Sequence, residues 1–292
     1  MINAVLVIDK PAGFTSHDVV NRIRRITGEK SVGHLGTLDP MATGVLPLVL
    51  GRFTRLAQFF KDSSKVYEGE IRFGFATDTY DAEGEPVGAV VSIQPTLEEV
   101  RCQLPAGRIL QTPPAYSAKK INGVAAYKLA RQDKPVEMKA VEVEVHRFEI
   151  QSIFGDRARF VAEVSAGTYI RSLAHDLGQS LGCGAHLSEL RRTRAGEFEL
   201  SQAITLDKFA YLPPIEISSG SSVWVHPRSI LRELPCVTGS SEVISYLGNG
   251  RTVNLPEFSD APLVKVFSSQ TNLFAIVQRI AGTLFRPKVV IG

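Results

Sequence analysis

The first thirty residues combine apolar runs and turn-forming residues in an order that predicts a strand followed by an amphipathic helix. Residues 4–8 form a continuous apolar run, and the sequence DKPAG that follows is typical of a turn. Ser16 is placed to cap a helix, and Gly28 suits the C-terminal end of that helix. One face of the predicted helix is apolar and carries Val19, Val20, Ile23 and Ile26.

In the middle of the chain, polar and apolar residues alternate with the period of two that predicts half-buried strands. The alternating segments are residues 65–75, 141–150 and 157–164, and the last two are expected to lie in one sheet. A helical period begins at Ile170 and predicts a helix with Leu173, Ala174 and Leu177 on one face. Another helix is expected to start at Thr96, where Glu98 and Glu99 suit the first turn.

The C-terminal part of the chain follows a different pattern. Pro213, Pro214 and four serines between residues 211 and 222 predict a linker or an extended crossing. Beyond Pro235 the apolar runs are short and separated by Ser, Asn and Gly; they comprise residues 263–267, 273–277 and 283–291. Such runs predict a small β module of about sixty residues, a size that folds alone only marginally.

Composition narrows the class of protein. A chain of 292 residues with 44% hydrophobic residues can form one large domain or two unequal ones. No apolar run reaches about 18 residues and no secretory signal is found at the N-terminus, so we expect no membrane span. Three cysteines without a Cys-x-x-Cys spacing predict reduced thiols and a cytoplasmic protein.

The net charge of +3 is small, but the charge is distributed unevenly. Residues 101–140 carry eight Lys or Arg against two Asp or Glu, whereas residues 61–100 carry three against nine. A basic block of this kind can bind phosphate. It can equally offset the neighbouring acidic block, so charge alone leaves nucleic-acid binding open.

The most unusual stretch of the sequence is residues 33–48, GHLGTLDPMATGVLPL. It places one carboxylate, Asp39, among glycines and threonines, and no other acidic residue occurs between Lys30 and Lys61. An isolated carboxylate that precedes an apolar, buried segment is typical of a positioned reagent. The alternative is that Asp39-Pro40 forms a turn or caps a helix.

Taken as a whole, GHLGTLDPMATGVLPL resembles the catalytic motif of the TruB-type tRNA pseudouridine synthases. Four further segments resemble the same family: DKPAGFTSHDVV, KVYEGEIRFG, QTPPAYSAKK and GTYIRSLAHDLG. The resemblance covers most of residues 5–194. It implies an α+β pseudouridine-synthase fold with a mixed, largely antiparallel central sheet flanked by helices, followed by a small C-terminal PUA-like β module.

This resemblance also implies a domain organisation. Residues 1–212 are expected to form the catalytic domain, with an RNA-gripping insertion at about residues 111–140. Residues 213–234 would then be a linker and residues 235–292 the PUA-like module.

Three catalytic residues follow from the resemblance. Asp39 corresponds to the essential carboxylate, Arg171 to its ion-pair partner and Tyr67 to a tyrosine that stacks on the target base. The position of Arg171 is unusual in itself, because the first turn of a helix disfavours a cation and thus suggests an anionic partner. Alternatively, Arg171 points to solvent, and Tyr67 is a buried strand aromatic.

Other residues are implied in substrate binding. His34, Tyr169 and Leu190 match positions that contact the substrate nucleotide or hold its pocket, although Leu190 also suits ordinary packing. Two basic clusters are candidates for phosphate contacts: Lys119, Lys120, Lys128 and Arg131 in the insertion, and Arg191, Arg192 and Arg194 farther on. Basic residues of this kind are also typical of solvated loops and edges.

No cofactor or metal is expected. The chain has neither a P-loop nor a GxGxxG motif, and its six histidines form no metal-binding spacing. The acidic residues 78–84 lack the EF-hand pattern and are expected to form a surface loop.

The resemblance thus predicts an isomerase that converts uridine 55 in the T-arm loop of tRNA to pseudouridine, acting as a monomer and without a guide RNA. The alternatives are a tRNA-binding or tRNA-folding protein that uses the same surface and a guide-RNA-dependent relative of the family.

Overall fold

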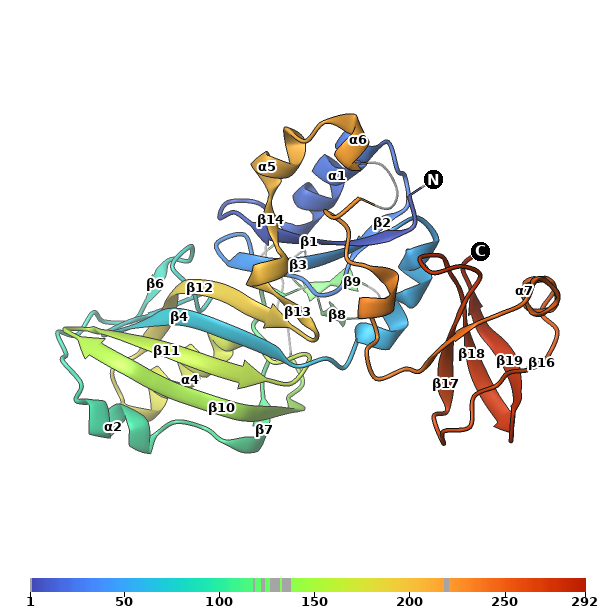
Figure 1. Ribbon diagram of the computed structural model, residues 1–292. Helices are drawn as coiled ribbons and strands as arrows, with labels where there is room; N and C mark the ends of the chain where they lie inside the picture. Colours follow the sequence, from blue (N-terminus) through green and yellow to red (C-terminus); the bar gives the residue numbers. More distant parts are fainter. Residues whose placement is uncertain (1, 118, 122–123, 127–131, 133–137, 218–220) are drawn as a thin grey trace. The chain divides into compact units, whose positions relative to one another are not determined.

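The structure is a computed structural model that describes residues 2–117, 119–121, 124–126, 132, 138–217 and 221–292. The chain divides into two compact units (Figure 1). The first comprises Met1–Pro40, Gly44–Lys61 and Gly196–Gly292, and the second comprises Met41–Thr43 and Asp62–Ala195.

The N-terminal part of the first unit is built on a short sheet. Strand β1 (Ala4–Lys10) pairs antiparallel with β3 (Thr43–Leu50) along its whole length and parallel with β14 (Ile204–Thr205). Strand β2 (Val32–His34) also pairs antiparallel with β3. The predicted burial of the apolar run after Gly44 is confirmed, because nearly every residue of β3 is buried.

Helix α1 (Ser16–Thr27) follows β1, as predicted, and its apolar face is buried. The prediction of Ser16 as its N-cap is wrong by one residue. Thr15 is the N-cap, and its side chain and that of Asp18 form a capping box. Gly28 ends the helix at a φ of 68°, a left-handed conformation that glycine adopts without strain.

The C-terminal part of the first unit contains a five-stranded sheet in the order β15-β17-β18-β19-β16. Its strands are β15 (Cys236–Thr238), β16 (Val253–Asn254), β17 (Leu263–Phe267), β18 (Leu273–Ala281) and β19 (Leu284–Val290). Together with α7 (Ser241–Gly248), they enclose an apolar cluster that includes Leu247, Val266 and Phe285. The three predicted C-terminal strands are thus confirmed.

The C-terminal sheet is attached to the 3₁₀ helix η1 (Gly51–Phe60). Arg52 donates a hydrogen bond to the carbonyl oxygen of Ile291 (3.1 Å), and Arg55 donates one to that of Val290 (2.8 Å). The remaining short elements of this unit are β13 (Phe198–Glu199), η2 (Leu200–Gln202), α5 (Leu206–Ala210), α6 (Pro214–Ile217) and η3 (Pro227–Ser229).

The second unit is built on an antiparallel sheet in the order β12-β4-β11-β10-β7. The strands are β4 (Lys65–Phe73), β7 (Gly107–Gln111), β10 (Val141–Phe154), β11 (Arg157–Val164) and β12 (Ala185–Ala195). Helix α4 (Ile170–Ser180) packs against β12, behind the sheet in Figure 1. The predicted strands and the predicted helix from Ile170 are confirmed.

Smaller elements complete the second unit. Helix α2 (Leu97–Cys102) starts with the predicted Thr96 cap. Two short ladders are formed by β5 (Ala76–Thr77) with β6 (Pro86–Val87), and by β8 (Lys120–Ile121) with β9 (Val124–Ala125). Residues 127–131, which follow β9 and Ala126, lie outside the described residues.

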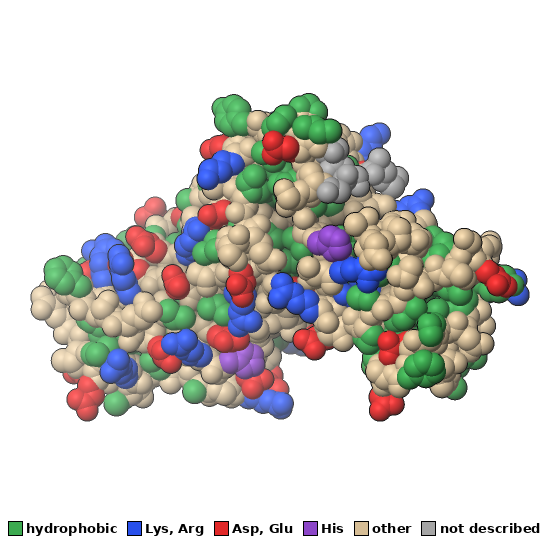
Figure 2. Space-filling model, viewed as in Figure 1, with side chains coloured by type: hydrophobic (Ala, Val, Ile, Leu, Met, Phe, Trp, Pro, Cys, Tyr) green, Lys and Arg blue, Asp and Glu red, His purple; other side chains and the backbone are tan. Residues whose placement is uncertain are grey.

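Charged side chains of both signs are interspersed over the second unit's sheet, as Figure 2 shows. Exposed ion pairs there include Arg147 with Glu149 (2.5 Å) and Arg108 with Glu142 (3.8 Å). Such exposed pairs contribute little to stability. The α+β architecture with a C-terminal β module agrees with the prediction. No helix among the described residues is long and apolar enough to cross a membrane.

Candidate active site

Asp39 lies half-buried in the loop between β2 and β3, and the residue before it is held by α1. Ser16 Oγ accepts a hydrogen bond from the N–H of Leu38 (2.8 Å) and donates one to the carbonyl oxygen of Leu38 (3.2 Å). Both residues are buried. Residues 40 and 41 form a bend that leads into β3, so the alternative interpretation of Asp39 as a helix cap is wrong.

The residue after Asp39 is held by Lys10, the last residue of β1. Lys10 is fully buried, and its ammonium donates hydrogen bonds to the carbonyl oxygens of Pro11 (2.8 Å), Phe14 (2.6 Å) and Pro40 (3.1 Å). The N–H of Gly13 donates a further bond to Pro40 O (2.9 Å). A buried ammonium is tolerated only with such partners. Asp39 is therefore fixed on both sides, which is the pre-organisation that a reacting group needs.

His34 is the last residue of β2, five positions before Asp39, and pairs across the ladder with Leu48. Its side chain is half-buried. The strand thus fixes the entry into the Asp39 loop, and the role of His34 in contacting substrate stays a prediction.

Arg171 lies in the first turn of α4 and only 4% of its side chain is exposed. Its guanidinium forms an ion pair with Asp81 (3.3 Å) and donates hydrogen bonds to the carbonyl oxygens of Thr79 and Tyr116 (2.9 Å each). The anionic partner that the helix position suggests is therefore present in Asp81. Pairing of Arg171 with Asp39 stays a prediction.

The acidic loop at residues 78–84 lies at the surface, as expected, with Asp78, Ala82 and Glu83 exposed, but Asp81 within it is buried. Only 4% of Asp81 is exposed, and its carboxylate also accepts hydrogen bonds from Thr79 Oγ1 (2.6 Å) and the N–H of Glu83 (3.1 Å). The backbone at Asp81 forms a bridge with Leu187 of β12, which holds this one residue of the loop against the sheet. The carboxylate stays buried because Arg171 compensates its charge.

Tyr80, next to Asp81, has a φ of 66°, an uncommon conformation for a residue other than glycine. Its ring stacks on that of His175 with 3.8 Å between the centroids. Burial raises the pKa of the Tyr80 hydroxyl and lowers the pKa of the His175 imidazole, so both groups are favoured in their neutral forms. The stacking of Tyr80 on His175 of α4 thus holds the residue before Asp81 against the helix that carries Arg171.

The start of α4 is also fixed to the segment after β7. The side chain of Gln111 is fully buried, accepts a hydrogen bond from the N–H of Tyr169 (2.8 Å) and donates one to its carbonyl oxygen (3.0 Å). Ser172 Oγ donates to the carbonyl oxygen of Thr112 (2.9 Å). These bonds hold the backbone of Tyr169, whose side chain is half-buried. They also fix Gln111 and Thr112, the residues at which the basic insertion begins.

Tyr67 and Leu190 lie on the neighbouring strands β4 and β12, with 8% and 7% of their surfaces exposed. Tyr67 is paired with Arg192, and Leu190 with Gly69. The strands approach so closely that a Cβ on Gly69 would lie 2.3 Å from the carbonyl oxygen of Glu189. This burial fits both predicted roles of Tyr67, as a base-stacking residue and as an ordinary core residue.

The arginines of β12 are not gathered into one cluster: strand alternation separates Arg191 from Arg192, and a register shift in the pairing with β4 lies between Arg192 and Arg194. Arg191 donates a hydrogen bond to Thr43 Oγ1 (3.2 Å), and Arg194 forms an ion pair with Glu163 (2.5 Å). Arg192 is buried, with 1% exposed, so the expectation of a phosphate contact from it does not fit this structure. Burial, together with the charge of Arg192, lowers the pKa of Lys65 to about 8.

Two acidic residues of the block 61–100 form ion pairs with arginines that lie outside the basic block 101–140. Arg157 of β11 pairs with Glu70 (2.5 Å), and Arg171 pairs with Asp81. The idea that the two blocks offset each other thus fails for these carboxylates. Among the basic candidates, Lys119 is half-buried and Lys120 lies in β8, whereas Lys128 and Arg131 fall outside the described residues.

Within the described ranges, no three His, Cys, Asp or Glu side chains gather as a metal site would require. The first unit offers instead one carboxylate, Asp39, in a fixed loop, and a carboxylate held in this way suits acid–base or nucleophilic chemistry. The second unit offers one buried guanidinium, that of Arg171.

A family model for the N-terminal domain of TruB family pseudouridylate synthases matches residues 24–170. A second model, for the C-terminal domain of tRNA pseudouridylate synthase B, matches residues 171–213. The chain belongs to the TruB family. The boundary between the two matches falls at Arg171, in the first turn of α4.

TruB-family relatives match almost the whole chain. A tRNA pseudouridine synthase B from Solibacter usitatus is 46% identical over 99% of this chain and 100% of its own length. Another from Stutzerimonas stutzeri is 41% identical over 91% of this chain and 88% of its own length. The match to the first relative extends through the C-terminal sheet, which neither family model covers.

Among solved structures, an archaeal box H/ACA sRNP Nop10–Cbf5 complex contains a chain that superimposes on this one with a TM-score of 0.71. The two share 25% identity over 99% of this chain and 86% of the other. The expectation of a pseudouridine-synthase fold is thereby confirmed.

Proposed function

We propose that this chain converts one uridine of tRNA to pseudouridine, and that the uridine is position 55 in the T-arm loop. Relatives with 46% and 41% identity over nearly their whole length are named tRNA pseudouridine synthase B, which supports the tRNA substrate. The observation that carries the catalytic assignment is the fixed position of Asp39, whose neighbours Leu38 and Pro40 are held by Ser16 and Lys10.

The reaction breaks the N1–C1′ bond of uridine, rotates the base and joins C5 to C1′. The hydrogen on C5 leaves as a proton and N1 gains one, so no atoms or electrons are gained or lost. In this proposal Asp39 acts as an ionised carboxylate, either as a nucleophile on the base or the sugar or as a base that removes a ribose proton.

Arg171 is the proposed partner of Asp39. A cation beside a carboxyl group favours its ionised form, which every proposed role of Asp39 requires. Asp81 and the carbonyl oxygens of Thr79 and Tyr116 orient the guanidinium. Arg171 then acts on Asp39 electrostatically, and Asp81 acts by positioning Arg171.

The uridine must be extruded from a folded tRNA arm, which costs a few kcal/mol of unstacking. Stacking on Tyr67 and phosphate contacts offset this cost in our proposal. His34, Tyr169 and Leu190 are proposed to contact the nucleotide, and phosphate contacts are proposed for Arg191, Arg194, Lys119 and Lys120, together with Lys128 and Arg131.

The hydroxyl of Tyr67 can be separated from its ring by substitution. Tyr67→Phe keeps the stacking face, whereas Tyr67→Leu removes both ring and hydroxyl. If the hydroxyl takes part in proton transfer, we expect Phe to reduce single-turnover isomerisation by about a hundred-fold, with tRNA affinity near that of the wild type. Near-wild-type rates for both variants would assign Tyr67 to the core alone.

The basic insertion is expected to contribute affinity rather than chemistry. Neutralising Lys119, Lys120, Lys128 and Arg131 together is expected to remove about two or three phosphate contacts. Since each contact contributes about 0.7 to 0.9, the slope of log K against log salt should become less steep by roughly 2. Turnover at saturating tRNA should change much less. Binding titrations at several salt concentrations measure the slope, and an unchanged slope would make the segment a solvated loop.

The relatives favour a stand-alone enzyme over a guide-RNA-dependent one, because identity to the tRNA pseudouridine synthases B exceeds that to the H/ACA-associated chain. We also propose the catalytic domain at residues 1–212, a linker at 213–234 and a PUA-like module at 235–292. The separate apolar core of the C-terminal sheet supports this division. We further propose that the protein is a monomer and acts in the cytoplasm.

A further inference from the structure

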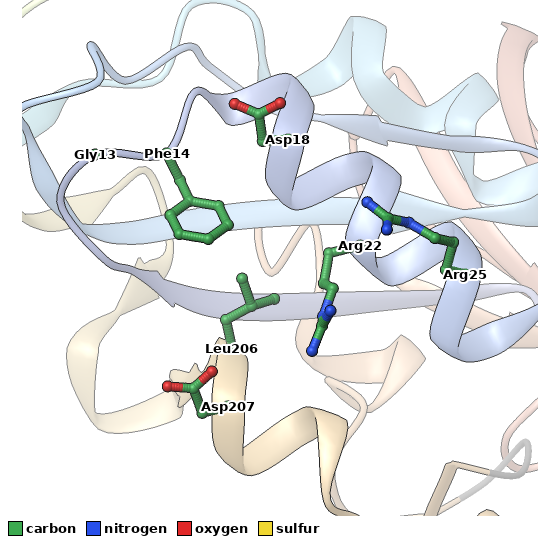
Figure 3. A pocket seen from close by; sticks show the side chains of 7 residues that line it. All are labelled: Gly13, Phe14, Asp18, Arg22, Arg25, Leu206 and Asp207. Atoms are coloured by element: carbon green, nitrogen blue, oxygen red, sulfur yellow. The ribbon is translucent and has the colours of Figure 1, made fainter.

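The first unit contains a pocket that none of the proposed catalytic residues lines (Figure 3). Its volume is about 360 Å³, within the range of sites that bind small organic groups. It lies between α1, the loop before α1 and the start of α5. The residues that line it are Gly13, Phe14, Asp18, Arg22, Arg25, Leu206 and Asp207.

One wall of the pocket is an exposed aromatic ring. Phe14 is 40% exposed although it is a large apolar residue, and Leu206 beneath the ring is buried. A half-exposed ring above an apolar floor is a platform on which a nucleobase can stack, because every base has an aromatic face.

Two arginines provide positive charge on one side. Arg22 and Arg25 are one helical turn apart on α1, so their side chains neighbour each other. Both are exposed, and with the described residues neither forms an ion pair; Arg25 donates only to the carbonyl oxygen of Asn21. Guanidinium groups without an acidic partner suit the oxygens of a phosphate.

A carboxylate from α5, that of Asp207, lines the same pocket. Asp207 forms no side-chain hydrogen bond or ion pair in the described part of the chain, although Arg22 and Arg25 line the same pocket. Asp18, by contrast, is engaged in the helix cap with Thr15. A carboxylate accepts hydrogen bonds, so Asp207 favours a base that carries an exocyclic amino group.

The pocket wall is connected directly to the Asp39 loop. Gly13 donates its N–H to Pro40 O, and the Lys10 ammonium bonds both Phe14 O and Pro40 O. A ligand that presses on Phe14 therefore contacts a loop that shares its hydrogen bonds with the residue after Asp39.

We infer that this pocket binds one unpaired nucleotide of the tRNA other than the target uridine. Its base stacks on Phe14, its amino group meets Asp207 and its phosphate lies on Arg22 and Arg25. This inference rests on the proposed function, because it takes tRNA as the substrate. The occupant lies close to the target in the RNA, because the pocket adjoins the catalytic loop.

The test is a coupling experiment between protein and RNA. Single abasic sites are placed in turn at the unpaired nucleotides of the T-arm of a tRNA transcript, and Kd is measured for the wild type and for Phe14→Ala. We expect one position at which the abasic change raises the Kd of the wild type by about tenfold but leaves the Kd of Phe14→Ala nearly unchanged. If no position couples to Phe14 by more than about threefold, the inference is wrong.

A second comparison tests the arginines. Arg22→Gln/Arg25→Gln should weaken tRNA binding by about tenfold and reduce the salt slope by roughly 1. The matched variant Lys30→Gln/Lys61→Gln removes the same charge from exposed positions of the same unit and should have a smaller effect. If both double variants weakened tRNA binding equally, Arg22 and Arg25 would contribute only as general surface charge, and the inference would be overturned.

Free AMP, CMP and GMP form the last arm of the test. If a free nucleotide binds to the pocket and no tRNA position couples to Phe14, the pocket is a small-molecule site. That result would overturn the proposal that a tRNA nucleotide occupies it. Because these readouts are affinities, they stay interpretable even if the wild type fails to isomerise uridine. Thermal unfolding of each variant reports whether it is folded.

Discussion

Asp39→Asn is expected to abolish isomerisation while leaving tRNA binding almost intact. The substitution keeps the size of the side chain and removes its charge, and we expect single-turnover rates to fall roughly a thousand-fold or more, as when an essential catalytic group is lost. Binding depends mainly on phosphate contacts, so Kd should stay within about threefold of the wild type.

The control for this variant is Asp62→Asn, the same change at an exposed carboxylate outside the Asp39 loop. Its rate and affinity should both match the wild type. If Asp39→Asn kept a rate within about tenfold of the wild type, Asp39 could not be the essential carboxylate.

Asp81→Asn is expected to have the second-largest effect, on both stability and rate. It leaves the buried guanidinium of Arg171 without its charged partner, and breaking a buried pair in this way typically costs about 3–5 kcal/mol. The melting temperature should fall by several degrees. Turnover of the remaining folded protein should also fall, because Arg171 loses the group that orients it.

A matched control is Glu163→Gln, which removes the carboxylate from the pair with Arg194. Both side chains of that pair are 33% exposed, so the free energy of unfolding should change by about 1 kcal/mol or less. Equal melting temperatures and rates for the two variants would contradict the structural role of Asp81. The pair can be tested further by combining Asp81→Asn with Arg171→Gln, since coupled residues give non-additive effects.

Much of the fold could be predicted because its elements carry clear local patterns. The alternation in residues 157–164 and the helical period from Ile170 led to β11 and α4 with nearly correct bounds. The N-cap of α1 was misplaced by one residue, because Thr15 and Ser16 are both good caps and only the reciprocal bond with Asp18 separates them.

The positioning residues of the candidate site could not be predicted, because their partners are far away in the sequence. Lys10 and Ser16 contact the Asp39 loop across 30 and 22 positions, and Arg171 lies 90 positions after Asp81. An acidic, turn-rich segment ordinarily stays in solvent. Only the buried guanidinium, contributed by another element, makes Asp81 an internal residue.

Tritium release from tRNA labelled at C5 of uridine tests the central proposal most directly, because only loss of the C5 hydrogen frees the label. The purified protein is incubated with the labelled transcript in the absence of any guide RNA. We predict release of one tritium per tRNA, lost when the uridine at position 55 is replaced by cytidine. Absence of release, or release that requires an added guide RNA, would contradict a stand-alone tRNA pseudouridine synthase.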